Sequence, residues 1–283
     1  MSYVFTKYSD VSTTSLDPIS QMVQMFLSQT GVLVQTVMDA TSTVGPGQDS
    51  ASYPKGTGFT AEDVTDDDST LLQAQVATFT IDKMDLDKHK AVLVAVKEKA
   101  SIQSLVNLMS EIQIRQTQAI VDAMEASIYA ALAATSASAP DHRVAFDTTG
   151  VIALSDISKS AYLLDVQNVP QTERFLIINP KQKMQLRALG DFTDASKYGS
   201  NEVLMTGEIG EIFGFRVLST NAVTADRAVA YHRTHAVFAM QQQMRFKMQD
   251  DLDQVATKML ITALYGVKTL DSGKRGVLMG SAS

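Results

Sequence analysis

A run of apolar residues with helical spacing dominates the middle of the chain. Between residues 103 and 134 the apolar side chains recur every three or four positions, and Glu111 and Arg115 stand four apart in the order that stabilises a helix. This period predicts one helix about 48 Å long, with Ser101 and Ser104 as candidate N-caps. Such a helix is longer than a globular domain of this size normally needs.

Strand patterns lie on both sides of this helix. Val76–Ile81 and Ala91–Val96 are apolar runs, and we interpret the charged stretch 82–90 between them as the exposed connection of a hairpin. From Gln242 to Gln249 apolar and polar residues alternate, which predicts a strand that is buried on one face and exposed to solvent on the other. Two shorter strands are predicted at Glu202–Leu204 and Phe213–Leu218.

The chain beyond Thr135–Pro140 has an α/β pattern, so this stretch of small residues ending in proline is the best domain boundary. Ser155 is positioned to cap an amphipathic helix that runs to Val166, and the apolar strand Phe175–Ile178 follows it. Asn179 then supplies the cap of a second helix, which we expect to end at Gly190. Both caps precede apolar residues with helical spacing.

The region before residue 80 lacks the composition of a core. Ile19–Val37 has an amphipathic pattern and predicts one helix, preceded by Asp17 and Pro18. Glycine and proline then interrupt residues 45–58, and five acidic residues crowd positions 62–68. Because this stretch has few apolar residues, we expect it to have no role in the subunit core and to pack against another molecule, such as a second copy of the chain.

Composition excludes several classes of protein. The 283 residues are 45% hydrophobic and 19% charged, which is typical of a globular chain of one or two domains. There is no cysteine, so disulfides, thiolate metal sites and cysteine nucleophiles are excluded, and a reducing compartment is favoured. No signal peptide or membrane-spanning segment is expected. The net charge of −7 argues against a dedicated nucleic-acid reader but allows loose contact with a polyanion.

Candidate catalytic and metal-binding motifs are weak. His232 and His235 have a spacing that metals use, but no HExxH motif or carboxylate at helical spacing accompanies them. Asp85 and Asp87 begin like a calcium loop, yet lysines occupy the next ligand positions. The glycines at 207–214 fit neither nucleotide-binding spacing, and no GxSxG elbow is present. We therefore assign no catalytic residue, metal site or cofactor, and expect a protein that is not an enzyme.

Four stretches together resemble the major capsid proteins of tailed bacteriophages, a fold shared with the encapsulin nanocompartment shells. They are Ile81–Leu108, which leads into the long helix, Phe175–Arg187 (FLIINPKQKMQLR), Gly207–Asn221 (GEIGEIFGFRVLSTN) and Ala263–Lys268 (ALYGVK). They occur in the family's order and spread over most of the chain. No single stretch is diagnostic, but the ordered set is specific.

The resemblance implies an α+β phage capsid fold with four parts. Residues 1–45 would be an N-terminal arm, and residues 46–80 an extended β-hairpin loop that lies across a neighbouring subunit. Residues 81–140 and 236–283 would form a peripheral domain, with the long helix as its spine. Residues 141–235 would form an α/β axial domain around the fivefold and sixfold axes. An overlong helix and an unsupported loop then have one cause, since their stabilising partners are other subunits.

The implied function is a major capsid protein that self-assembles into the icosahedral head of a tailed phage around double-stranded DNA. The resemblance implies pentamers and hexamers of this chain, non-specific DNA contact, separate scaffolding and portal proteins, and assembly in the host cytoplasm into a virion, with no membrane. It leaves room for a decoration protein. Two alternatives are an encapsulin-like cellular shell, which would enclose a protein cargo, and a soluble metal-dependent enzyme using His232 and His235.

The extended loop supplies the expected intersubunit contacts. Some relatives cross-link their loops through lysine and asparagine, and Lys55 lies in the loop, but nothing marks an asparagine as its partner. Mechanical interlocking is therefore preferred to a covalent bond. The residues expected to contact a neighbouring subunit are Tyr53, Lys55, Phe59, Asp66, Asp67 and Asp68.

Overall fold

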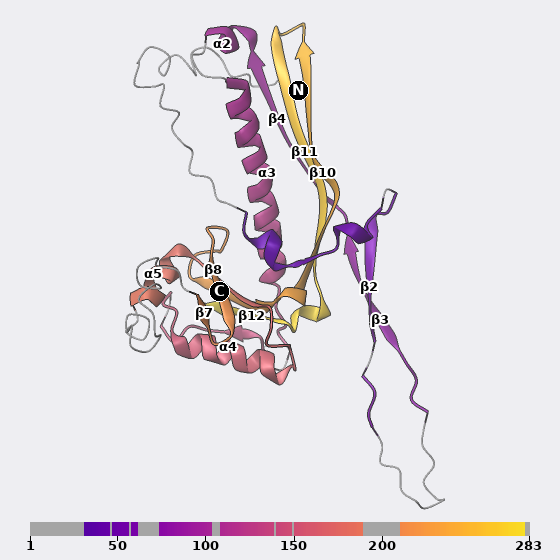
Figure 1. Cartoon of the computed structure of the whole chain (residues 1–283), viewed down its shortest axis with the longest axis vertical. Coiled ribbons are helices and arrows are strands. Elements are labelled where there is room, and N and C mark those ends of the chain that lie inside the picture. Colours follow the sequence, from indigo (N-terminus) through magenta and orange to yellow (C-terminus); the bar gives the residue numbers. More distant parts are fainter. Residues whose placement is uncertain are drawn as a thin grey trace, which may run out of the picture.

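The protein is an α+β chain, and the strands of its described residues form three separate sheets (Figure 1). A four-stranded sheet and a long helix make an elongated part, here called the long lobe. A six-stranded sheet with two helices makes the compact lobe, and a two-stranded hairpin projects from the long lobe. The computed structural model describes residues 31–45, 47–56, 58–61, 74–103, 108–138, 140–148, 150–188 and 210–280.

The long helix predicted between 103 and 134 is confirmed as α3, Leu108–Leu132. Its 25 residues span about 37 Å at the usual helical rise. The predicted cap Ser101 is wrong, because this residue lies inside the separate short helix α2, Glu98–Gln103. Of the helix predicted over 19–37, residues up to 30 lie outside the described residues. Leu33–Thr36 forms a 3₁₀ turn, η2, and not an α-helix.

The sheet of the long lobe has the strand order β1-β10-β11-β4. Antiparallel pairing joins β10 to β11 along nearly their whole length, and β11 pairs with β4 on its other side. The strand predicted over 242–249 is confirmed as part of β10, the longest strand among the described residues. Its predicted buried face is wrong, because Met244 and Met248 are exposed. Helix α3 covers one face of this sheet (Figure 1). The bounds are β1 Met38–Asp39, β4 Lys88–Lys97, β10 Ala236–Asp251 and β11 Ala256–Thr269.

The sheet of the compact lobe has the order β5-β12-β9-β6-β8-β7. Helices α4 and α5 pack against it through buried residues such as Ile157, Leu164 and Leu186. The last strand, Gly276–Gly280, pairs with β9 in this sheet, whereas the division made from the sequence gives it to the peripheral domain. The bounds are α4 Leu154–Val166, α5 Pro180–Ala188, β5 Arg143–Val144, β6 Arg174–Ile178, β7 Glu211–Ile212, β8 Phe215–Ser219, β9 Arg227–His232 and β12 Gly276–Gly280.

Local signals in the compact lobe are partly confirmed. The Asn179 side chain accepts a hydrogen bond from the Lys181 amide at 3.0 Å and caps α5 as predicted. Ser155 does not cap α4, because it is the second residue of this helix and its hydroxyl donates to Asp147 at 3.0 Å. The Asp156 carboxylate accepts the N–H of Ala153, which precedes the helix, at 3.1 Å. Phe213 is in the tight turn between β7 and β8 with a φ of 47°, so the predicted strand begins only at Phe215. The residues 189–209, with the predicted strand at 202–204, lie outside the described residues.

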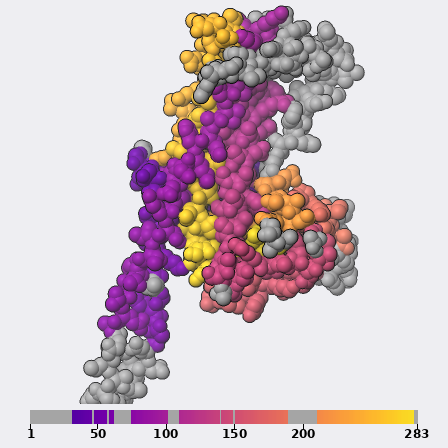
Figure 2. All heavy atoms as spheres, turned by 180° about the vertical axis from the view of Figure 1, so that it is seen from behind, coloured from indigo at the N-terminus to yellow at the C-terminus, as the bar shows by residue number. Residues whose placement is uncertain are grey.

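The projecting hairpin consists of β2, Ser50–Gly56, and β3, Phe79–Asp85, paired antiparallel over all seven positions. Figure 2 shows its described part standing clear of the compact lobe. The sequence-based hairpin over 76–96 is wrong, because β3 pairs with β2 whereas β4 pairs with β11. The charged stretch 82–90 therefore joins two different sheets.

Three groups of buried apolar side chains hold these parts together. The largest lies between α3 and β11 and includes Tyr231 of β9, so it joins the two lobes. A second fills the compact lobe. A third lies at the base of the hairpin, where Ala51 and Tyr53 pack with Met84 and Leu86. The expectation that residues 46–80 have no core role is wrong at this base, since β2 contributes side chains to the core.

Candidate functional site

The hairpin has one face turned to its own chain and one face open. Ala51, Tyr53 and Met84 lie on the first face, because alternate residues of a strand share a side. On the other face Pro54, Phe79 and Ile81 are exposed, with Phe79 68% and Ile81 64% accessible. Exposed aromatic and branched side chains on a strand pair are typical of a contact surface. The hairpin is therefore held at its base and free to bind along its outer face.

An ion-pair network fixes the base of the hairpin. Lys55 of β2 forms an ion pair with Asp271, which lies in the short 3₁₀ turn after β11. The Asp271 amide donates to the Asp82 carboxylate at 2.9 Å, and Arg275 approaches Asp271 at 3.5 Å. Both strands of the hairpin are thus tied to the segment that leads into the compact lobe. The Lys55 ammonium is engaged within its own chain.

The six residues predicted to contact a neighbour lie in different surroundings. Tyr53 is half-buried in its own chain, and burial raises the pKa of its hydroxyl. Phe59, beyond the end of β2, is 66% exposed. Asp66, Asp67 and Asp68 lie outside the described residues. Their contact with a second subunit stays a prediction.

A second exposed surface follows the outer half of β10. Strand β1 pairs with β10 only at Val237 and Phe238, so among the described residues the remaining edge of β10 has no strand beside it. Met244 and Met248 on this strand are exposed, and Phe246 between them is half-buried against the α3 side. An edge of unpaired backbone groups with apolar side chains is a surface suited to another chain.

Sequence reasoning missed a buried glutamate in α3. Glu125 has no exposed surface, and one carboxylate oxygen accepts the Leu33 N–H at 2.8 Å. Burial raises the pKa of this carboxyl, and hydrogen bonds from the backbone amides of residues 32–34 partly oppose the rise. The signal was present in the helical period, because Glu125 stands beside Met124 and three residues before Ile128 on the buried face. This contact fastens the start of η2 to the long helix.

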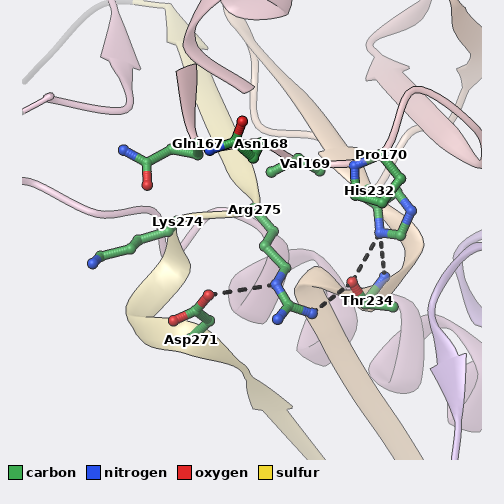
Figure 3. A pocket seen from close by; sticks show the side chains of 9 residues that line it. All are labelled: Gln167, Asn168, Val169, Pro170, His232, Thr234, Asp271, Lys274 and Arg275. Carbon is green, nitrogen blue, oxygen red and sulfur yellow. Dashed lines mark hydrogen bonds and ion pairs between the residues drawn. The ribbon is translucent and has the colours of Figure 1, made fainter. Parts of the chain in front are cut away.

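A hollow of about 330 Å³ lies between the loop after α4 and the segments that join the lobes (Figure 3). The Arg275 guanidinium is bound to Thr234 at 2.8 Å and to Asp271, while the Lys274 side chain points away from it. The cationic groups do not converge on one point, so this hollow is a gap between chain segments and not a preformed binding site. It is lined by Gln167, Asn168, Val169, Pro170, His232, Thr234, Asp271, Lys274 and Arg275.

The two histidines considered as metal ligands have separate partners. The His232 Nδ1 accepts the Thr234 N–H at 3.2 Å, and burial lowers the pKa of this imidazole. His235 is fully buried and bonds through Nε2 to the Leu132 carbonyl at 3.1 Å. Within the described residues, no three histidine, aspartate or glutamate side chains gather closely enough to hold a metal ion. No helix in this part of the chain is long and apolar enough to cross a membrane.

Comparison with known proteins points to one family. A family model described as phage capsid protein matches residues 85–279. Among solved structures, the chain is similar to one from Mycobacterium phage Che8, with 18% identity, a TM-score of 0.75, and 90% of this chain and 93% of the other covered. The capsid structure of cyanophage P-SCSP1u has 13% identity, coverage of 90% and 89%, and a TM-score of 0.74. A chain from Gordonia phage Cozz has 13% identity, coverage of 94% and 91%, and a TM-score of 0.71. No curated protein sequence matches the chain.

Proposed function

The chain belongs to the phage capsid protein family, and we propose that its copies close into the icosahedral head of a tailed phage as interlocked pentamers and hexamers. This family supplies structural shell proteins, and the proposed role needs no catalytic residue. In this arrangement the long lobe is the peripheral domain and the compact lobe is the axial domain. Strand β12 then belongs to the axial domain, because it pairs with β9.

The outer face of the β2–β3 hairpin carries this proposal. Phe79 and Ile81 are more than half exposed on a strand pair whose opposite face is packed against its own chain. Covering a large apolar side chain contributes about 1.5–3 kcal/mol, and a shell repeats each contact at every subunit. The surface that receives the hairpin is proposed to be the neighbour's long lobe, where Met244 and Met248 are exposed beside an open strand edge.

The test replaces both apolar residues of the outer face. The double variant Phe79→Asp and Ile81→Asp is expected to keep the melting temperature of the subunit and to lose closed particles in electron micrographs. Thr80→Asp is the matched control, because Thr80 lies between them on the other face of β3. Particle yields for the double variant equal to those of the control would contradict the proposal.

The cargo of the shell is proposed to be double-stranded DNA held by non-specific contact. A net charge of −7 limits adhesion of the genome to the protein during packaging, since tight binding needs many lysine and arginine contacts to phosphates. Scaffolding and portal functions are assigned to separate proteins, with assembly in the host cytoplasm. Nuclease-protected DNA in particles purified from infected cells is the expected finding. A protein cargo without DNA would favour the encapsulin-like alternative.

A further inference from the structure

Among the described residues, the chain passes between the two lobes at three places, and these places meet. One is residues 133–138 and 140–142 after α3, another is residues 233–235 between β9 and β10, and the third is residues 270–275 between β11 and β12. The Ser136 amide donates to the Gly273 carbonyl at 3.2 Å, and the Leu270 amide donates to the His235 carbonyl at 2.9 Å. A change in the angle between the lobes therefore acts on this junction as well as on the apolar core that the two lobes share.

Two fully buried histidines lie inside the junction. His235 bonds through Nε2 to the carbonyl of Leu132, the last residue of α3, at 3.1 Å. His142 bonds through Nδ1 to the Gly276 carbonyl at 2.9 Å. A carbonyl only accepts, so each of these nitrogens carries a proton. The remaining nitrogens, Nδ1 of His235 and Nε2 of His142, are buried without a hydrogen-bond partner among the described residues.

The backbone at Gly276 connects the two rings. Its carbonyl accepts the hydrogen bond of His142, and a Cβ atom at this position would lie 2.6 Å from the His235 ring. Only glycine fits there, so the His235 ring has no free space toward this strand. The ring of Tyr231 lies on another side, with its centroid 6.3 Å from that of His235. The ring is thus confined by three elements of the fold.

The charges around His235 oppose its protonation. Burial, together with the smaller effects of the nearby His142 and Arg275, lowers the pKa of this imidazole to about 4, although the hydrogen bond to the Leu132 carbonyl partly opposes the shift. Tyr231, which faces the ring from β9, stays neutral because burial raises the pKa of its hydroxyl. Asp271 is bound to Lys55 and to Arg275. A proton added to this junction gains no carboxylate partner from the described residues.

We propose that His235 makes this junction a proton-sensitive hinge, which holds the angle between the two lobes when its ring is neutral and loosens it when the ring is protonated. A cation at this buried ring is costly unless water reaches it. Parting of the three joining segments admits that water, whereas the sheets of both lobes keep their pairing. The inference concerns the single subunit and holds whether or not the proposed shell forms.

The pH range in which the hinge is expected to respond follows from the lowered pKa of His235. Because the folded state binds a proton at His235 less readily than an unfolded chain does, stability from this group is complete above about pH 6.5 and declines as the pH falls toward 4. The lobes are expected to change their relative position within this interval. Above it, the angle is fixed.

A pair of spin labels measures the hinge directly. The chain has no cysteine, so Ser158→Cys on α4 and Asp253→Cys at the tip of β10–β11 attach one label to each lobe of the full chain. The distance distribution between the labels is expected to shift and broaden between pH 6.5 and 4. With His235→Gln added, the shift is expected to vanish, since glutamine can donate to the Leu132 carbonyl without titrating. His89→Gln is the control, because His89 is exposed on β4 and its replacement leaves the response intact.

Two results would overturn the hinge. One is an unchanged distance distribution in the unsubstituted histidine background down to pH 4, and the other is the same shift in the His235→Gln variant. If that variant does not fold, nitrogen NMR of the His235 ring in the unsubstituted chain replaces it. Protonation of His235 in step with the distance change supports the hinge, and a distance change that precedes its protonation refutes it.

Discussion

Replacing Glu125 tests how the start of the described chain is fastened to the long helix. In Glu125→Ala the backbone amides of residues 32–34 lose the carboxylate that accepts their hydrogen bonds. Each amide left without an acceptor costs about 1–3 kcal/mol. Removal of the buried carboxylate offsets part of this cost, because a buried charge carries its own desolvation penalty. The net loss at η2 is expected to be about 3 kcal/mol.

Hydrogen exchange measures this loss at the residue concerned. A loss of about 3 kcal/mol corresponds to roughly 100-fold faster exchange of the Leu33 amide, since each 1.4 kcal/mol is tenfold. Amides in the compact lobe, such as Leu176, are expected to keep their rates. Glu125→Gln is the matched variant, because its amide oxygen accepts the same N–H without a charge. Equal loss of protection in both variants would refute the role of the oxygen as the acceptor.

The pH dependence supplies a second check on the same residue. Burial raises the pKa of Glu125, so the folded state holds this proton more tightly than the unfolded chain. The stability gained in this way is present below about pH 4.5 and is lost as the pH rises through the raised pKa. The Gln variant therefore gains stability relative to the parent with rising pH in urea unfolding. Parallel curves for the two proteins would show that the pKa of this carboxyl is the same in the folded and unfolded states.

Two further predictions concern the hairpin and the compact lobe. Replacing residues 57–78 by Asn-Gly, which joins paired strands through a tight turn, is expected to leave the melting temperature unchanged and to abolish closed particles, whereas removal of residues 48–70 also lowers it because β2 is lost from the core. Closed particles from the Asn-Gly chain would count against an interlocking loop. Arg174→Met is expected to destabilise the subunit by about 3 kcal/mol in urea unfolding, because the buried guanidinium bonds Asp165 and the Val169 carbonyl, each at 2.6 Å. Equal stability would mean that well-packed methionine replaces the ion pair without loss.

The parts of the fold that were predicted correctly depend on neighbours in the sequence. Helix α3 keeps one apolar period for seven turns, and the cap of α5 needs only Asn179 and the amide two residues later. The prediction that 82–90 connects a hairpin is wrong because β3 and β4 do not pair with each other. Their pairing partners are β2 and β11, which lie elsewhere along the chain. A charged stretch between two apolar runs is equally typical of a hairpin turn and of a passage from one sheet to another. Periodicity alone does not distinguish them.

The junction shows why the remaining features required the fold. The spacing of His235 from His232 makes it a candidate metal ligand in the sequence, yet in the structure it contacts the carbonyl of Leu132 and the backbone of Gly276. Neither partner is a side chain, so no residue type in the sequence reveals them. Burial, and not a ligand, sets the properties of this imidazole, and burial is decided by three segments that come from distant parts of the chain. A histidine can therefore have a metal-like spacing in the sequence and lie in the structure as a buried side chain packed between the segments that join the two lobes.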